Sequence, residues 1–331
     1  MSLDRVFMTL GMFIMDRFEY LDESGQPTGR EAQEQTKIGG GGTYASIGAR
    51  MFLQDDQISM IVDKGFDFQS SVLEQLSEYG RDMWIYREHA DRGTTRALNL
   101  YRGEHRGFEY LTPRLRITPK DFTSAQRARY LHFICSPTRA QEIMREVHGI
   151  ADWNPVTIYE PIPDRCVPSE LPALREVLPD IHILSPNALE ACTLLSLASD
   201  REPSRELIEA AATQLYDFGV GPNGQGSVLI RSGELGVLIH DSTGRLWIEA
   251  YFQSRDSDKV VDVTGAGNAF LGGLAAGLYH SNQDVRQAAI YASISASFVI
   301  EQHGLPTFKD GLWNGDSPER RLHSLRSRVV G

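Results

Sequence analysis

The five residues Thr264-Gly265-Ala266-Gly267-Asn268 have the types and spacing that point most directly to chemistry. Their three small members allow a tight turn, and the Gly- and Ala-rich apolar run 269–279 that follows is helical in pattern. The first N–H groups of a helix have no internal acceptor, and the helix dipole is positive at that end. This segment is therefore predicted to bind a phosphate or to stabilise a developing anion.

Repeated strand and helix patterns are predicted to position this turn. From residue 129 onward, short apolar runs alternate with helical ones, which predicts a mostly parallel sheet covered on both faces. Such sheets bind ligands at the carboxyl ends of their strands. The run Arg5–Met15 is predicted to be one buried strand. Two polar inserts, approximately 17–37 and 83–112, are predicted to form a small lid of exposed antiparallel strands on a single domain spanning 1–331.

Five segments, taken in order along the chain, resemble the motifs of the ribokinase/PfkB family of sugar and nucleoside kinases. The most specific is the turn before the helix, which in that family reads D-T-x-G-A-G-D. The resemblance implies a three-layer α/β/α ribokinase-like fold with a small β lid, and the cofactors ATP and Mg²⁺. In the family, the last aspartate of the motif takes the proton from the attacking hydroxyl. Asn268 stands there in this chain, as in a fungal branch of the family, and an amide cannot accept a proton near neutral pH.

The substrate side of the resemblance lies near the N-terminus. Asp16 corresponds to an aspartate that binds sugar hydroxyls in the family, and Gly40 and Gly41 to a glycine pair beside the substrate. Thr43 stands where the family usually has a substrate-binding asparagine, so the pocket is expected to have changed. Taken alone, a solvated carboxylate and a flexible glycine loop explain these residues equally well.

The segment from Asn187 to Glu190 carries the N-x-x-E pattern that helps to place magnesium and phosphates in the family, through water. Mg²⁺ is commonly held by one or two carboxylates together with substrate phosphates. The same two residues are also predicted to form a helix N-cap and its capping-box partner. Both roles stay open. The nearby Tyr159-Glu160-Pro161 resembles the family's Asp-Pro after a middle strand, with Glu in place of Asp.

The nucleotide side is predicted from a strand, a glycine turn and the approach to the later helix. A plain β-hairpin is the competing interpretation of that turn. One of the residues, Ser293, replaces the family's adenine-side asparagine. The nucleotide-binding residues implied by the resemblance are Arg231, Ser232, Gly233, Gly236, Asp262, Thr264 and Ser293.

Two functions follow from these motifs. The first is ATP- and Mg²⁺-dependent phosphoryl transfer to a hydroxyl of a sugar or nucleoside, weakened because general-base assistance is typically worth about 10²- to 10⁴-fold. The second is a pseudokinase that binds a nucleotide or metabolite and acts through protein partners. An oxidoreductase is disfavoured, because no G-x-G-x-x-G with an acidic ribose partner occurs near the start.

Composition narrows the partners and the compartment. The 44 acidic residues against 33 basic ones give a formal net charge of −11, which argues against binding to nucleic acid or anionic membranes. The apolar run Val6–Met15 is too short to span a bilayer. Three scattered cysteines fit a reducing compartment, so a cytoplasmic location is expected. A protein partner or a homodimer stays open.

Overall fold

Nine strands form the central sheet of the computed structural model, which describes residues 5–22, 24–26, 28, 37–102, 105–197 and 203–329. Every neighbouring pair from one edge to the seventh strand is parallel, and the last two strands add as an antiparallel meander. In spatial order the strands are β5 (Trp84–His89), β4 (Ile58–Gly65), β1 (Arg5–Thr9), β8 (Ala128–Cys135), β9 (Val156–Pro161), β10 (Ile183–Leu184), β11 (Ser227–Arg231), β12 (Val237–Asp241) and β13 (Gly244–Ile248).

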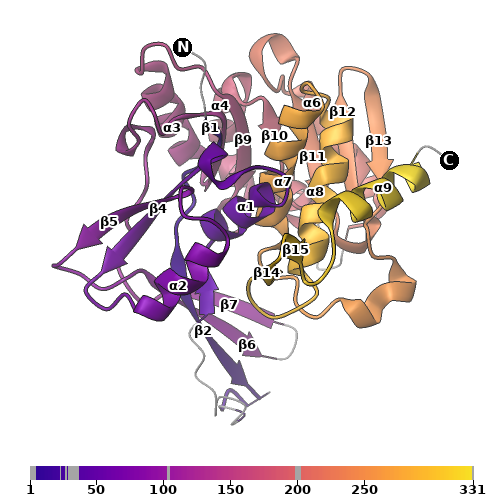
Figure 1. Cartoon of the computed structure of the whole chain (residues 1–331). Helices are drawn as coiled ribbons and strands as arrows, with labels where there is room; N and C mark the ends of the chain where they lie inside the picture. The colour runs from indigo at the N-terminus through magenta and orange to yellow at the C-terminus, as the bar shows by residue number, and fades with distance from the viewer. Residues whose placement is uncertain are drawn as a thin grey trace.

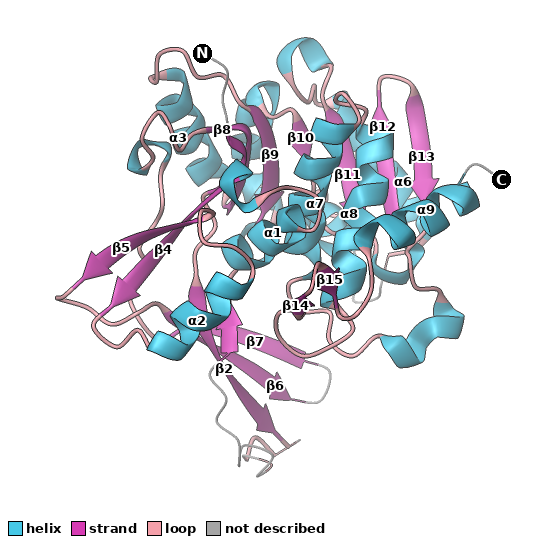
Figure 2. Ribbon diagram, in the orientation of Figure 1, coloured by secondary structure: helices cyan, strands magenta, loops and turns pink. Residues whose placement is uncertain are grey.

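Helices cover both faces of this sheet, as expected for parallel strands that are apolar on both sides (Figures 1 and 2). The helices of one layer share a hydrophobic core with one face, and they are α1 (Gly41–Arg50), α2 (Ser70–Glu78), α7 (Ala266–His280), α8 (Val285–Val299) and α9 (Pro318–Val329). The helices of the other layer are α3 (Pro137–His148), α4 (Leu171–Val177), α5 (Ala188–Leu194) and α6 (Arg205–Asp217). The predicted three-layer α/β/α fold with a mostly parallel sheet is confirmed.

Helices α1 and α7 pack backbone against backbone. A β-carbon added at Gly48 would collide with the main chain of Ala269, and one added at Gly272 would collide with the main chain of Ala45. This close approach brings the first turns of the two helices together, with Gly41 beside the Asn268 side chain. The glycine-rich pattern of α7 therefore serves to position its N-terminus.

A second, four-stranded sheet adjoins the main one and lies below it in Figure 2. Its order is β3 (Lys37–Gly39), β2 (Ile14–Leu21), β6 (Arg96–Arg102) and β7 (His105–Tyr110). The expectation of antiparallel pairing holds for β2 with β3 and for β6 with β7, but it is wrong for β2 with β6, which pair in parallel.

The two inserts contribute unequally to this small sheet. Within the range 83–112, β5 belongs to the edge of the large sheet, so only the residues from Arg96 onward add strands to the small one. Within the range 17–37, residues 23, 27 and 29–36 lie outside the described part of the chain.

The prediction of one strand over Arg5–Met15 is wrong, because the chain leaves the large sheet after Thr9 and enters the small sheet at Ile14. At this break the chain passes close to the start of α1. A β-carbon at Gly11 would collide with the backbone of Gly42, so these two segments meet at main-chain contact. The loop that results faces the start of α1.

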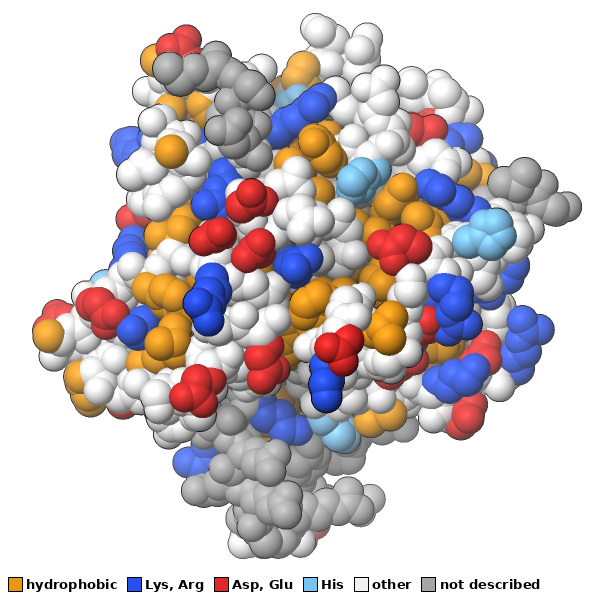
Figure 3. All heavy atoms as spheres, viewed as in Figure 1, with side chains coloured by type: hydrophobic (Ala, Val, Ile, Leu, Met, Phe, Trp, Pro, Cys, Tyr) orange, Lys and Arg blue, Asp and Glu red, His pale blue; other side chains and the backbone are white. Residues whose placement is uncertain are grey.

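The surface carries mixed charge. Acidic and basic side chains are interspersed over the face shown in Figure 3, and no broad basic area dominates it. A short hairpin, β14 (Phe308–Lys309) with β15 (Leu312–Trp313), connects α8 to α9. In the described ranges, none of the helices combines the length and apolar character needed to cross a bilayer.

Candidate active site

Two cavities meet at the N-terminus of α7. The first, of about 600 Å³, is lined in part by Ala266 and Gly267. The second, of about 480 Å³, is lined in part by Thr264, Gly265 and Asn268. Consecutive residues of one turn thus face two different cavities. Two molecules bound in these cavities would meet at the turn, which is the arrangement needed to transfer a group from one to the other.

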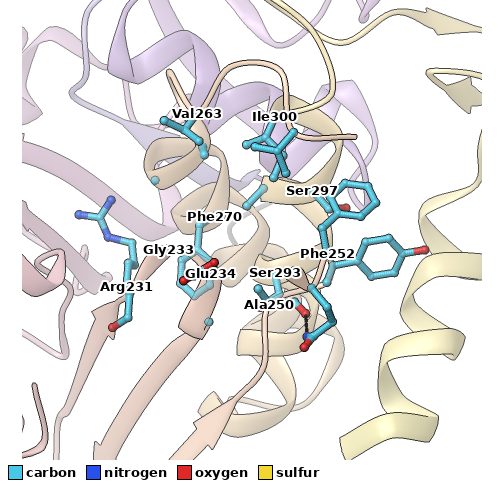
Figure 4. Close-up of a pocket in the computed structure, with 18 of the residues that line it drawn as sticks. Arg231, Gly233, Glu234, Ala250, Phe252, Val263, Phe270, Ser293, Ser297 and Ile300 are labelled. Carbon is cyan, nitrogen blue, oxygen red and sulfur yellow. Dashed lines mark hydrogen bonds between the residues drawn. The ribbon is translucent and has the colours of Figure 1, made fainter. Parts of the chain in front are cut away.

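The first cavity lies against the hairpin that joins β11 to β12 (Figure 4). Ser232, Gly233 and Gly236 line it from the turn, and Ser293 lines it from α8. Figure 4 shows Arg231 at one end and Phe252 at the other. The glycine turn for which two interpretations were open therefore forms a β-hairpin that also borders the first cavity.

The second cavity lies between the small sheet and the carboxyl ends of β1, β8 and β9. Asp16 reaches it from β2, where the side chain is 6% exposed, and Gly40 and Gly41 line it from the start of α1. Because Asn268 lines the same cavity, three of the four predicted substrate-side residues and the expected position of the base are brought together.

The first turn of α7 is open to an anion. Gly265 is the N-cap in the left-handed conformation, with φ 81°, and a β-carbon there would collide with the Tyr44 ring. This N-cap provides no side-chain hydrogen bond to the helix. N–H groups without a side-chain cap and the positive end of the helix dipole therefore remain for a ligand.

A buried charge network surrounds Glu160, which is 5% exposed at the end of β9. Its Oε1 lies 2.8 Å from Nη1 of Arg231, and its Oε2 accepts a 2.7 Å hydrogen bond from the Asn268 side-chain amide. Nε2 of His132 lies 3.5 Å from the same Oε2, and Nδ1 of His132 lies 2.9 Å from the Thr9 hydroxyl. The side-chain amide of Asn268 is thus oriented by the Glu160 carboxylate.

Arg231 occupies the space beside the anion-binding turn. A β-carbon at Gly267 would collide with Nη1 of Arg231, so the guanidinium packs against the first turn of α7. Nη2 donates to the Ser185 carbonyl at 3.0 Å and lies 3.6 Å from Oε2 of Glu190. One cation therefore separates the carboxylates of Glu160 and Glu190 and borders the first cavity.

The pKa values of the two glutamates shift in opposite directions, although Arg231 favours the charged form of both. Burial opposes ionisation of Glu160, but the charge of Arg231 and the contacts from His132 and Asn268 hold its pKa below the ordinary value. Burial raises the pKa of Glu190 to about 7, although Arg231 favours its charged form. Near neutral pH, Glu160 is therefore ionised, whereas Glu190 is partly protonated.

The raised pKa of Glu190 predicts a pH-dependent contribution to stability. The folded protein holds this proton more tightly than the unfolded chain does, so ionisation costs stability progressively as pH rises from about 4.5 to above 7. The variant Glu190→Gln lacks that cost. Relative to wild type, the variant is expected to be more stable at pH 8 than at pH 5. The difference in the free energy of unfolding should change between the two pH values by on the order of 1–3 kcal/mol.

Urea unfolding of both proteins at the two pH values measures this difference. The change with pH is the informative quantity, because the substitution also alters hydrogen bonds at either pH. An equal stability difference at pH 5 and pH 8 would contradict the assigned pKa.

Three predicted site residues line neither cavity. The buried Thr43 hydroxyl donates to the Gly39 carbonyl at 2.8 Å. Asp262 accepts from the Thr264 N–H at 2.9 Å and lies 3.2 Å from Nδ1 of His303. Glu190 lies behind Arg231. Thr264, assigned to the nucleotide side by the sequence, lines the second cavity.

The N-x-x-E segment forms the predicted capping box of α5. Asn187 donates to Glu190 through its main-chain N–H at 2.7 Å and through its side-chain amide at 2.8 Å, and Glu190 N–H donates back to Asn187 Oδ1 at 2.8 Å. Both glutamate oxygens are thereby used within the protein. Across the described ranges, no cluster of three or more His, Cys, Asp or Glu residues could hold a metal. Asn187 and Glu190 could therefore contribute to Mg²⁺ binding only through water and the phosphates of a ligand.

Several residues of the site are absent from the sequence-based assignment. Glu160 gave a partial signal, since it follows a buried strand in a segment that resembles a family motif. His132 gave none, because a histidine within an apolar strand looks like any buried polar residue. Further residues that line the second cavity and were not predicted are Arg114, Arg116, Arg139 and Asp164.

Comparison with known proteins agrees with this geometry. The pfkB family carbohydrate kinase model matches residues 6–309. An uncharacterised protein of Schizosaccharomyces pombe is 34% identical, over 97% of this chain and 92% of its own. Protein MAK32 of Saccharomyces cerevisiae is 32% identical, over 93% and 88%. The structure of Arabidopsis thaliana ribokinase complexed with ribose and ATP covers 96% of this chain and 98% of its own, with a TM-score of 0.67 and 16% identity, a likeness of fold.

Proposed function

Because this chain belongs to the pfkB family of carbohydrate kinases, we propose that it transfers a phosphoryl group weakly from ATP to a hydroxyl of a sugar-like substrate. The observation that carries this proposal is the meeting of two cavities at the uncapped first turn of α7. ATP would occupy the first cavity and the hydroxylated substrate the second. The Arabidopsis ribokinase of the same fold was solved with ribose and ATP, which supports this arrangement.

The chemistry expected here is mainly positioning and charge stabilisation. The N–H groups of α7 would bind the transferring phosphoryl group, and Arg231 supplies a positive charge at the border of the first cavity. Bound Mg²⁺ would neutralise phosphate charge. Asn268 orients the substrate hydroxyl by hydrogen bonding without taking its proton, so the rate is expected to be low.

A second candidate is a protein that binds nucleotide and acts through a partner without catalysis. The observation in its favour is the 2.7 Å hydrogen bond from Asn268 to Glu160, since this amide is already engaged on its protein side. The two candidates share nucleotide binding in the first cavity. They differ in whether turnover occurs and whether it responds to a carboxylate at position 268.

Nucleotide binding in the first cavity is tested by narrowing that cavity. Ala296 lines it from α8, and Ala296→Phe would place a ring inside it. We expect ATP–Mg²⁺ to bind the wild type and to bind the variant at least about tenfold more weakly, a change of about 1.4 kcal/mol. Isothermal titration calorimetry measures both constants.

The matched control is Ala125→Phe, which adds the same ring at an exposed turn position outside both cavities. It should leave ATP binding unchanged. Failure of the wild type to bind ATP–Mg²⁺ would contradict both candidate functions. Equal weakening in the two variants would place the nucleotide elsewhere.

A further inference from the structure

We propose that the second cavity binds a sugar-like molecule that carries its own anionic group, a phosphate monoester or a carboxylate, held by Arg116 and Arg139 with Arg114 nearby. The assignment of this cavity to the substrate rests on the proposed function. The binding of an anion rests on the arginines themselves.

The cavity holds more cationic side chains than a neutral sugar requires. Three arginines line it, against the two carboxylates of Asp16 and Asp164. Neutral hydroxyls are recognised by single hydrogen bonds, whereas a guanidinium matches the paired oxygens of phosphate and carboxylate. Three guanidinium groups beside one space repel each other unless an anion lies among them.

Arg139 has a donor group that awaits an acceptor. Its side chain is 15% exposed, and Nη1 donates to Oε2 of Glu142 at 2.7 Å. Nη2 is buried and has no hydrogen-bond partner among the described residues. A buried unsatisfied donor of a charged group is costly, and a ligand oxygen would satisfy it.

Arg116 and Arg114 have no carboxylate partner within ion-pair distance in the described part of the chain, and both are exposed. The Arg114 guanidinium lies over the Tyr110 ring, 4.8 Å from its centroid. Arg116 and Arg139 both contribute to the electrostatic environment of Glu142, so their charges act in the same region. Arg114 and Arg116 therefore carry positive charges that no carboxylate of the described residues pairs with, and a ligand anion could pair with them.

The rest of the cavity wall is consistent with a molecule that has two functional ends. Ser136, the N-cap of α3, lines the wall together with Arg139, and the positive end of that helix dipole adds to the field of the arginines. Asp16, Gly41 and Asn268 line the same cavity at the α7 turn. A ligand with its anion among the arginines would present hydroxyl groups to that turn.

Calorimetric titration of the full chain without nucleotide tests the proposal at fixed ionic strength. The probes are ribose 5-phosphate, fructose 6-phosphate and gluconate, with ribose, fructose and glucose as neutral counterparts, and inorganic phosphate as a competitor. At least one anionic probe is expected to bind more than about tenfold tighter than its neutral counterpart. Preference for gluconate or for the sugar phosphates identifies the anion.

The variants Arg139→Gln and Arg116→Gln should each weaken the anionic probe by about tenfold or more and leave neutral sugars unchanged. The control Arg175→Gln removes an exposed arginine that lines neither cavity and should change nothing. Far-ultraviolet circular dichroism confirms that each variant is folded.

Three outcomes would overturn the inference. They are equal affinity for charged and neutral probes, anion binding that is insensitive to both arginine substitutions, and no binding of any anionic probe at millimolar concentration. If inorganic phosphate binds as tightly as the sugar phosphates that it displaces, the cavity is an adventitious ion site only. That result would also refute the inference. Arginine-dependent sugar-phosphate binding in a protein that does not bind ATP–Mg²⁺ would refute the proposed kinase function and leave this inference standing.

Discussion

Arg231→Met is expected to lower the free energy of unfolding by about 3–5 kcal/mol at pH 8, since removing one member of a buried ion pair leaves an uncompensated charge. The side chains of Glu160 and Glu190 are 6% and 7% exposed, so water replaces the lost partner poorly. The loss should be smaller at pH 5. There, both carboxyls can take up a proton at less cost once the cation is gone.

Urea unfolding followed by circular dichroism measures this effect. Arg245→Met is the matched control, because Arg245 pairs with Glu209 at 3.4 Å and both side chains are much more exposed, at 46% and 36%. Exposed pairs of this kind contribute about 0–1 kcal/mol. Adding Glu160→Gln to Arg231→Met should restore part of the stability. A cost no greater than that of the control would show that the network does not stabilise the fold.

Asn268→Asp is expected to raise phosphoryl transfer, and a fully effective general base at this position would contribute about 10²- to 10⁴-fold. The single substitution should fall short of that range near neutral pH. It places a carboxylate where the Asn268 amide now donates to Glu160 at 2.7 Å, and two carboxylates this close share a proton. The new group is then partly protonated and a poor base.

The double variant Asn268→Asp/Glu160→Gln removes this conflict, because a glutamine can donate to the new aspartate and accept from Arg231. Its turnover should exceed that of the single variant at pH 7, and the gap should narrow as pH rises. ATP consumption over a panel of neutral and phosphorylated sugars and nucleosides measures the rates. Glu160→Gln alone and Asn268→Ala serve as controls and should show no gain.

The outcomes separate the two candidate functions. A gain in the aspartate variants supports a kinase whose base has been lost. No gain in either variant, in a protein that binds ATP–Mg²⁺, supports the non-catalytic nucleotide-binding protein. Full turnover in the wild type would show that another group takes the proton from the substrate.

The arrangement at position 268 could not be predicted from the local sequence. The sequence shows that an amide replaces an acid, but it does not show what faces that amide. Glu160 lies 108 residues away and reaches Asn268 only because β9 and the start of α7 converge at the carboxyl edge of the sheet. A carboxylate introduced at position 268 would therefore face a neighbouring carboxylate that only the fold reveals.

The same division applies to the substrate side. The resemblance to the kinase family placed the glycines of the α1 approach on the substrate side, and Gly40 and Gly41 line the second cavity. The arginines of the second cavity were not predicted, because each stands in an ordinary polar segment, and the wall of the cavity combines the chain before β8, the start of α3 and the small sheet. Thr43 shows the reverse case, a residue selected by motif position whose hydroxyl the structure uses within the main chain.

By itself, the sequence determined the layered α/β architecture and the glycine-rich turn that opens α7. These depend on periodicity, glycine placement and helix-end chemistry, which act over a few neighbouring residues. Only the tertiary structure decided that Glu160, Arg231 and Asn268 form one buried network, and that three arginines border the second cavity. Charges act through space, so their pairing depends on which strands lie adjacent in the sheet and not on distance along the chain.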